Sequence, residues 1–228
     1  MINTVIFDFD GVIADSVETI FKWFQHAASV FGIQLPINNS SELIANFREP
    51  FPDFYKFLGF DWDKDQPKIY NEYIAYHSSH PVTLINGIET VIKNLAATPE
   101  MKLGIVSSNM QKILEYNLKY HNLSDQFDVV IGIDKDKNSP LKPDPTLLLE
   151  ALDTMGAGMQ DSVYIGDQPS DVLTAYNASQ TRNEGQMQTI SVTTGFATRE
   201  KLETHNPTAD HIIDHPSEIL EKLDIYKN

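Results

Sequence analysis

The 228-residue chain contains no cysteine, so it has neither disulfide bonds nor thiolate ligands for a metal. Basic residues are also scarce, because 17 Lys and Arg stand against 32 Asp and Glu and give a formal net charge of −15 at pH 7. Recognition of a polyanion depends on clustered basic residues, so this charge argues against nucleic acid or an anionic membrane as a partner. A small anionic substrate would have to be met locally, by a metal ion and one or two cations.

The chain also lacks a long apolar run, a basic-then-apolar leader, internal repeats and low-complexity tracts. We therefore expect a soluble, cytoplasmic protein with no membrane contact, present as a monomer or a homodimer. Its 228 residues are enough for one full hydrophobic core with an insertion.

The most informative stretch is residues 4–13, TVIFDFDGVI. Side chains alternate between the two faces of an extended strand, so Asp8 and Asp10 point to one side and Phe7 and Phe9 to the other. The uncharged Val-Ile-Phe run before them fits a strand buried on both faces, as in a parallel sheet covered by helices. Ligands of such sheets bind beyond the carboxyl ends of the strands. The stretch therefore predicts two converging carboxylates at a functional centre.

Three further blocks follow in the chain, and each lies next to a predicted strand or helix. They are GIVSSN at residues 104–109, KPDP at residues 142–145 and YIGDQPSD at residues 164–171. A single Asp-x-Asp pair after a strand would be a weak signal, because acidic turns are common there. Four such blocks, each beside a predicted strand or helix, would rarely occur together in one chain by chance.

The spacing of apolar residues divides the chain into two parts. Residues 15–80 show helical periodicity only, whereas helices and strands alternate from Asn86 onwards. This pattern predicts an α/β protein with a doubly wound parallel sheet and a small all-helical cap domain inserted after the first strand. We expect the core to comprise residues 1–14 and 81–228 and the cap residues 15–80. Pro67 is expected to open the last cap helix, and residues 179–188 are expected to form a polar loop.

Together the four blocks resemble those of the haloacid dehalogenase superfamily, which has a Rossmann-like core. The position of the cap resembles that of the phosphoglycolate phosphatase and β-phosphoglucomutase group. The resemblance implies that Asp8 attacks phosphorus to form an aspartyl phosphate, and that Asp10 acts as general acid and base. Lys142 would be the catalytic cation that offsets charge on the nucleophile and the phosphoryl oxygens.

The resemblance also implies Mg²⁺ as the cofactor. Its ligands would be Asp8, the main-chain carbonyl of Asp10, and Asp167, since Mg²⁺ prefers an octahedron of oxygen atoms. Asp171, in the first turn of a helix, either touches the metal or orients Lys142. An acidic residue is favoured at that position by the helix dipole in any case.

Five residues are candidates for substrate binding. Ser107 and the amide of Ser108 would bind phosphate at a helix N-terminus, although an ordinary helix cap uses the same geometry. Gly11 would let the backbone approach the site closely, and Asn109 would contact substrate. Arg48, the only arginine between residues 15 and 80, would bind a distal carboxylate or phosphate, unless it is simply a solvated surface residue.

Other conspicuous side chains of the cap have simpler explanations. His77 and His80 lie on one helix face without a third ligand, and imidazole suits Mg²⁺ poorly. A set of aromatic residues is expected to form the core of the cap rather than a ligand box: Phe51, Phe54, Tyr55, Phe57, Phe60 and Trp62.

The sequence thus predicts a Mg²⁺-dependent phosphatase for a small phosphorylated metabolite, a phosphoglycolate-like or sugar-phosphate-like monoester. A phosphomutase of the β-phosphoglucomutase type would keep the same four blocks and hold a bisphosphate intermediate. A non-catalytic phosphate-sensing protein would keep the fold alone.

Overall fold

The computed structural model describes residues 2–134 and 139–224; residues 1, 135–138 and 225–228 of the predicted core lie outside the described residues. The core is built on a six-stranded parallel sheet with the strand order β5-β4-β1-β6-β7-β8. The strands are β1 (Thr4–Phe7), β4 (Lys102–Met110), β5 (Val129–Ile133), β6 (Ser162–Gly166), β7 (Gln188–Val192) and β8 (His211–Ile213). The predicted doubly wound α/β sheet is confirmed.

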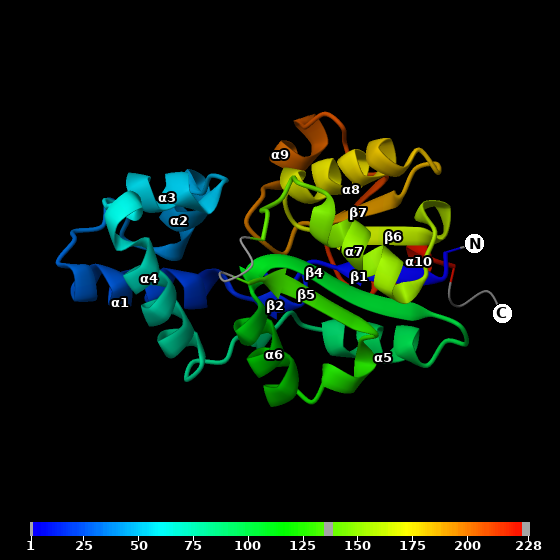
Figure 1. Ribbon diagram of the computed structural model, residues 1–228, viewed down its shortest axis with the longest axis horizontal. Coiled ribbons are helices and arrows are strands. Elements are labelled where there is room, and N and C mark those ends of the chain that lie inside the picture. Colours follow the sequence, from blue (N-terminus) through cyan, green and yellow to red (C-terminus); the bar gives the residue numbers. More distant parts are fainter. Residues whose placement is uncertain (1, 135–138, 225–228) are drawn as a thin grey trace.

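Helices cover both faces of this sheet, as Figure 1 shows. Val5 and Phe7 of β1 pack on one face with α5 (Ile88–Ala96), α6 (Gln111–Tyr120) and α10 (Glu218–Lys222). Ile6 points to the opposite face and packs with α7 (Thr146–Met155) and α8 (Pro169–Arg182). All three side chains are fully buried, and each contributes about 1.5–3 kcal/mol to folding by leaving water. No helix in residues 2–134 and 139–224 is long and apolar enough to cross a membrane.

Short helices complete the connections of the core. Within residues 2–134 and 139–224 these are the 3₁₀ helices η1 (Ser124–Gln126) and η3 (Met159–Asp161) and the helix α9 (Arg199–Thr204). Helix α9 follows β7 and lies next to α8 in Figure 1, so it lies on the same side of the sheet as α8.

The cap consists of α1 (Val17–Phe31), α2 (Ser40–Asn46), α3 (Phe51–Phe57) and α4 (Trp62–His77), which lie beyond the carboxyl ends of the strands in Figure 1. It has its own hydrophobic core, separate from the two clusters of the sheet. Trp23 is fully buried there, and its indole N–H donates a hydrogen bond of 3.0 Å to the Tyr55 hydroxyl. Four of the predicted core aromatics are buried in this cluster: Phe54, Tyr55, Phe60 and Trp62. The inserted all-helical cap is therefore confirmed as part of the fold.

A two-stranded ladder lies where the chain enters and leaves the cap. Strand β2 (Ala14–Asp15) pairs in antiparallel fashion with β3 (Thr83–Leu84). The sequence pattern predicts only helices for residues 15–80 and alternation from Asn86, and neither of these short strands was expected, because two residues are too few to show a period of two. Strand β2 crosses the predicted boundary at residues 14/15, and β3 lies just after the predicted boundary at residues 80/81, so this division of the chain stays a prediction.

Two local predictions were wrong. Pro67 does not open the last cap helix, because α4 begins at Trp62, where Asp61 accepts a hydrogen bond from the Lys64 amide and Trp62 is buried. The predicted polar loop begins too early, since α8 continues to Arg182. Ser179 fits inside the protein because its hydroxyl donates to Ala175 and accepts from the Met187 amide.

Candidate active site

The predicted functional residues meet at the carboxyl edge of the sheet. Strand β1 lies between β4 and β6 in the sheet, so β4 and β5 lie on one side of it and β6, β7 and β8 on the other. In such a sheet a crevice forms at the carboxyl ends of the strands, at the point where the strand order reverses. Asp8 directly follows β1, and Asp167 directly follows β6. Ser107 lies in β4 beside them, and all three side chains are buried.

A buried ion triad links three of these blocks. The Lys142 ammonium lies 2.8 Å from Asp8 Oδ1 and 2.6 Å from Asp171 Oδ1. Burial by itself would lower the pKa of Lys142, but Asp171 and Asp8 raise it well above its ordinary value. Lys142 therefore stays charged beside Asp8. Because Asp171 Oδ2 also accepts from the Gln168 amide at 2.9 Å, both Asp171 oxygens are engaged within the protein.

Carboxylates outnumber this ammonium in the centre of the site. Asp8, Asp167 and Asp171 are all buried, and each offers an oxygen within 4.8 Å of the others. Burial and the charges of Asp171 and Asp8 raise the pKa of Asp167 well above its ordinary value. Three buried carboxylates with one buried cation leave negative charge without a partner, and oxygen donors are the ligands that Mg²⁺ prefers. The residues present therefore fit a divalent cation.

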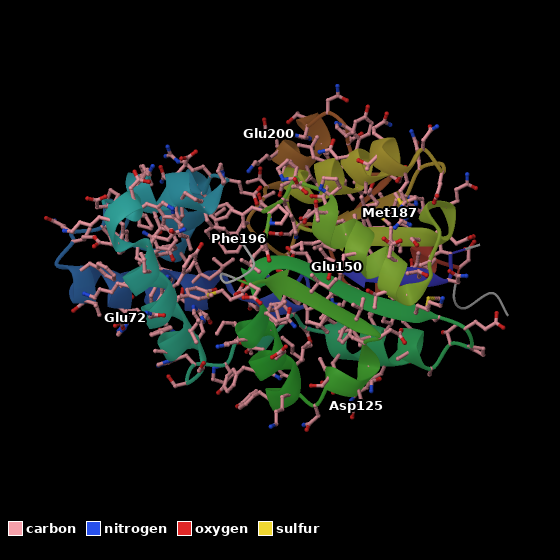
Figure 2. All side chains as sticks on the ribbon, in the orientation of Figure 1. Glu72, Asp125, Glu150, Met187, Phe196 and Glu200 are labelled. Carbon is pink, nitrogen blue, oxygen red and sulfur yellow. The ribbon has the colours of Figure 1, made fainter. Side chains whose placement is uncertain are left out.

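The loop after β7 closes over Asp167, and the sequence analysis missed it. The Phe196 amide donates a hydrogen bond of 2.6 Å to Asp167 Oδ2. A Cβ on Gly195 would lie 2.0 Å from the same oxygen, so only glycine allows this approach. The Phe196 ring also packs 4.7 Å from that of Phe47 in the cap, and Figure 2 shows Phe196 between cap and core. A Thr-Thr-Gly run after a parallel strand was the available signal.

Asp10 lies in a chain of hydrogen bonds that begins in the cap. Asn109 Nδ2 donates to Asp10 Oδ2 at 2.7 Å, while Asn109 Oδ1 accepts from the Tyr73 hydroxyl at 3.1 Å and from the Met110 amide at 2.7 Å. The two donors to Oδ1 fix the orientation of the amide. Burial, and secondly the charge of Asp8, raise the pKa of Asp10 to about 6. Asp10 is therefore poised to carry a proton near neutral pH.

A cavity of about 100 Å³ lies between the cap and this centre. Its floor includes Asp8, Asp10, Lys142 and Asp167, and the serine block lines one side. Its upper walls come mainly from aromatic cap residues: Trp23, Phe24, Phe47, Phe51, Tyr55, Trp62, Tyr70 and Tyr73. Several rings that form the cap core thus also face the site.

The serine block is placed differently from the prediction. Ser107, Ser108 and Asn109 all line the cavity, and the Ser107 hydroxyl accepts from the Asn109 amide at 3.2 Å. However, β4 continues through these residues to Met110, and α6 begins only at Gln111. Pairing of Met110 with Ile133 of β5 extends the strand after a register shift, so Ser107 does not lie at a helix N-terminus.

Two other candidates lie outside the cavity. Gly11 has a φ of +76°, and a Cβ there would lie 2.6 Å from Asp167 Oδ2, so its observed role is close packing. The Arg48 guanidinium lies over the Phe57 ring at 4.1 Å and lines a neighbouring pocket with Lys201 and His205. Contact of either residue with substrate stays a prediction.

The fold and the site define a class: an α/β enzyme whose carboxylate-rich centre lies at the switch point of a parallel sheet, beneath a helical cap. The chain belongs to the haloacid dehalogenase-like hydrolase family, whose model matches residues 5–182. The predicted family and the predicted class of enzyme are confirmed.

Individual relatives agree over almost the whole chain. Pyrophosphatase PpaX of Bacillus cereus strain AH820 is 28% identical over 222 residues, which cover 96% of this chain and 95% of the relative. The structure of a predicted phosphatase from Clostridium acetobutylicum matches with a TM-score of 0.81 and 23% identity, covering 99% of each chain. A haloacid dehalogenase-like family hydrolase from Streptococcus pneumoniae matches with a TM-score of 0.76 and 22% identity, covering 97% of this chain and 98% of that one. The two structures support the fold.

Proposed function

We propose that this protein is a Mg²⁺-dependent phosphatase that hydrolyses a small phosphate monoester through an aspartyl phosphate on Asp8. The observation that carries the proposal is the arrangement around Asp8: the Lys142 ammonium at 2.8 Å, and Asp10, with a pKa raised to about 6, two residues further on. A non-catalytic phosphate sensor would have no use for a proton carrier beside such a carboxylate. The phosphatase and pyrophosphatase names of the relatives agree with this chemistry.

In the first step, an Asp8 oxygen attacks phosphorus and the bond from phosphorus to the leaving oxygen breaks. Asp10 gives its proton to that oxygen, so the alcohol leaves neutral. In the second step, water attacks the phosphorus of the aspartyl phosphate, Asp10 takes the proton of that water, and the Asp8 carboxylate is released with phosphate.

The remaining residues bind and orient. Lys142 offsets negative charge on Asp8 and on the phosphoryl oxygens, and Asp171 holds Lys142 in place. Ser107 and the Ser108 amide bind the phosphoryl group at the cavity wall. Asp8, the main-chain carbonyl of Asp10, and Asp167 would hold Mg²⁺, which would neutralise phosphoryl charge and keep Asp8 ionised.

The test is phosphate release from phosphoglycolate, sugar phosphates and nucleotides, and from the anhydride pyrophosphate, with Mg²⁺ or with a chelator. We expect Mg²⁺-dependent turnover that Asp8→Asn and Asp10→Asn abolish and that the matched exposed variant Asp15→Asn retains. No turnover of any ester by the folded native chain would refute the proposal. Turnover that requires a sugar bisphosphate would identify a phosphomutase instead.

A further inference from the structure

The cavity is strongly negative before any substrate enters. Five carboxylates line it, namely Asp8, Asp10, Glu49, Asp167 and Asp171, whereas Lys142 is the only Lys, Arg or His among the described residues that line it. A divalent cation bound by the aspartates would still leave the balance negative, and a phosphoryl group adds up to two more negative charges. A second anionic group on the leaving side of the substrate would therefore be repelled.

Glu49 places one of these negative charges on the cap side. It lies between α2 and α3 and lines both the cavity and the neighbouring pocket. Within the described part of the chain, Glu49 forms no ion pair. Much of the Glu49 side chain is exposed to solvent, but the protein around its carboxyl and the charge of Asp171 still raise the pKa of that carboxyl. A cation beside Glu49 would relieve this cost.

Aromatic rings of the cap line the same cavity as Glu49. Trp23, Tyr55, Trp62 and Tyr70 all line the cavity and come from the cap. Aromatic rings attract cations through their quadrupole, and most strongly where water is excluded. Arg48, the cap cation expected from sequence to meet a distal anion, instead lies over Phe57 outside the cavity. The cap thus offers the leaving group an acid and aromatic rings rather than a positive charge.

The cavity also limits the size of the leaving group. Its volume of about 100 Å³ is smaller than the cavity of about 150 Å³ that accepts a benzene molecule. Because the same space must also receive the phosphoryl group, only a small leaving group fits it, and a nucleoside does not.

We propose that the substrate is the phosphate monoester of a small amino alcohol, whose ammonium group is bound by Glu49 and the cap aromatics. This inference rests on the proposed phosphatase activity and names its substrate class. The reaction releases phosphate and the free amino alcohol by the two steps given above. Phosphoglycolate and pyrophosphate, which carry a second anionic group, are predicted to be poor substrates.

The test uses three esters whose leaving groups have nearly the same size and differ in charge. They are phosphoethanolamine (cationic), 2-hydroxyethyl phosphate (neutral) and phosphoglycolate (anionic), each assayed with Mg²⁺. We expect kcat/KM to fall in this order, by about tenfold or more from the first to the last. Glu49→Gln should lower kcat/KM for phosphoethanolamine about tenfold and change that for the neutral ester less than twofold.

The matched control is Asp53→Asn, which removes an exposed carboxylate from the first turn of α3, outside the cavity, and should retain the order of the native chain. Circular dichroism establishes that each variant is folded, and the comparison of the three esters on the native chain needs no variant. Equal rates, or a preference for phosphoglycolate, would overturn the inference while leaving the phosphatase activity in place. A preference for phosphoglycolate would indicate that its carboxylate binds in the neighbouring pocket, which is lined by Arg48, Lys201 and His205. Failure of every ester would refute the phosphatase proposal itself, and this inference with it.

Discussion

Replacing Asp10 by Asn should stabilise the metal-free protein while it removes activity. The folded protein raises the pKa of Asp10 from 3.8 to about 6, mainly by burial, so folding disfavours the ionised form. At pH 7.5 the carboxyl is ionised in both the folded and the unfolded state, and the full cost is present. Below pH 3.8 it is protonated in both states, and the cost disappears. An Asn side chain keeps the shape and an oxygen that can accept from Asn109, but it carries no charge.

The magnitude follows from the shift in pKa. About two units correspond to about 3 kcal/mol, which we reduce to about 2 kcal/mol because Asp10 is only half-buried. For a chain of this length, that free energy corresponds to a rise in Tm of about 4–8 °C.

The assay is thermal unfolding of the native chain and of Asp10→Asn in a chelator, at pH 7.5 and at pH 4.5. At pH 4.5 the gain should fall to about one third of its value at pH 7.5, since the folded-state carboxyl is then mostly protonated and no longer buries a charge. Asp15→Asn is the control, because Asp15 is an exposed aspartate close by in the chain.

An unchanged or lower Tm at pH 7.5 would show that Asp10 is not destabilised by its surroundings. A gain of equal size at both pH values would show that the effect does not arise from ionisation. Either result would refute the reasoning.

Four further predictions concern binding and stability. Lys142→Met should cost about 3–5 kcal/mol of unfolding free energy in urea titrations and most of the activity, because it leaves two buried carboxylates unpaired. Saturating Mg²⁺ should raise the Tm of the native chain by about 5–10 °C in a thermal shift assay, and Asp167→Asn should abolish the rise. Tyr73→Phe should lower kcat/KM about three- to tenfold, because it removes the hydrogen bond that orients the Asn109 amide toward Asp10. Tyr70→Phe should leave kcat/KM unchanged. Burial lowers the pKa of His77 from 6.5 to about 3, so native stability should fall as the pH drops below 6.5; His77→Leu should remove about 2–3 kcal/mol of that loss at pH 4.5, measured by urea unfolding at pH 7.5 and 4.5.

The parts of the fold that depend on local pattern could be predicted from the sequence. Asp8 and Asp167 each follow a continuous apolar strand, and parallel strands bring their carboxyl ends to one edge, so their meeting required no knowledge of distant contacts. The start of α1 after Ser16 and its end at Gly32 likewise follow from residue types that stop and start helices.

The remaining parts depend on contacts between segments far apart in the chain. The Phe196 amide binds Asp167 through the backbone, so the residue type of Phe196 does not reveal the contact, and only Gly195 beside it marks the close approach. Tyr73 reaches Asn109 only because the cap docks on the core. The position of Tyr73 in the sequence predicts only that it lies on one face of a helix. At Ser107, pairing of the strand with β5 outweighed the tendency of the following residues to start a helix. Tertiary contacts decided each of these positions.

The ladder of β2 and β3 means that the chain leaves the core and returns to it at a single point. A segment whose two ends are already joined by hydrogen bonds adds little strain to its host, since the cost of closing a loop grows only slowly with its length. The cap can therefore lengthen, shorten or be exchanged for another segment during evolution without altering the path of the sheet. The aspartates at the strand ends would remain where they are. A different cap would line the cavity with different residues and so select a different substrate for the same reaction.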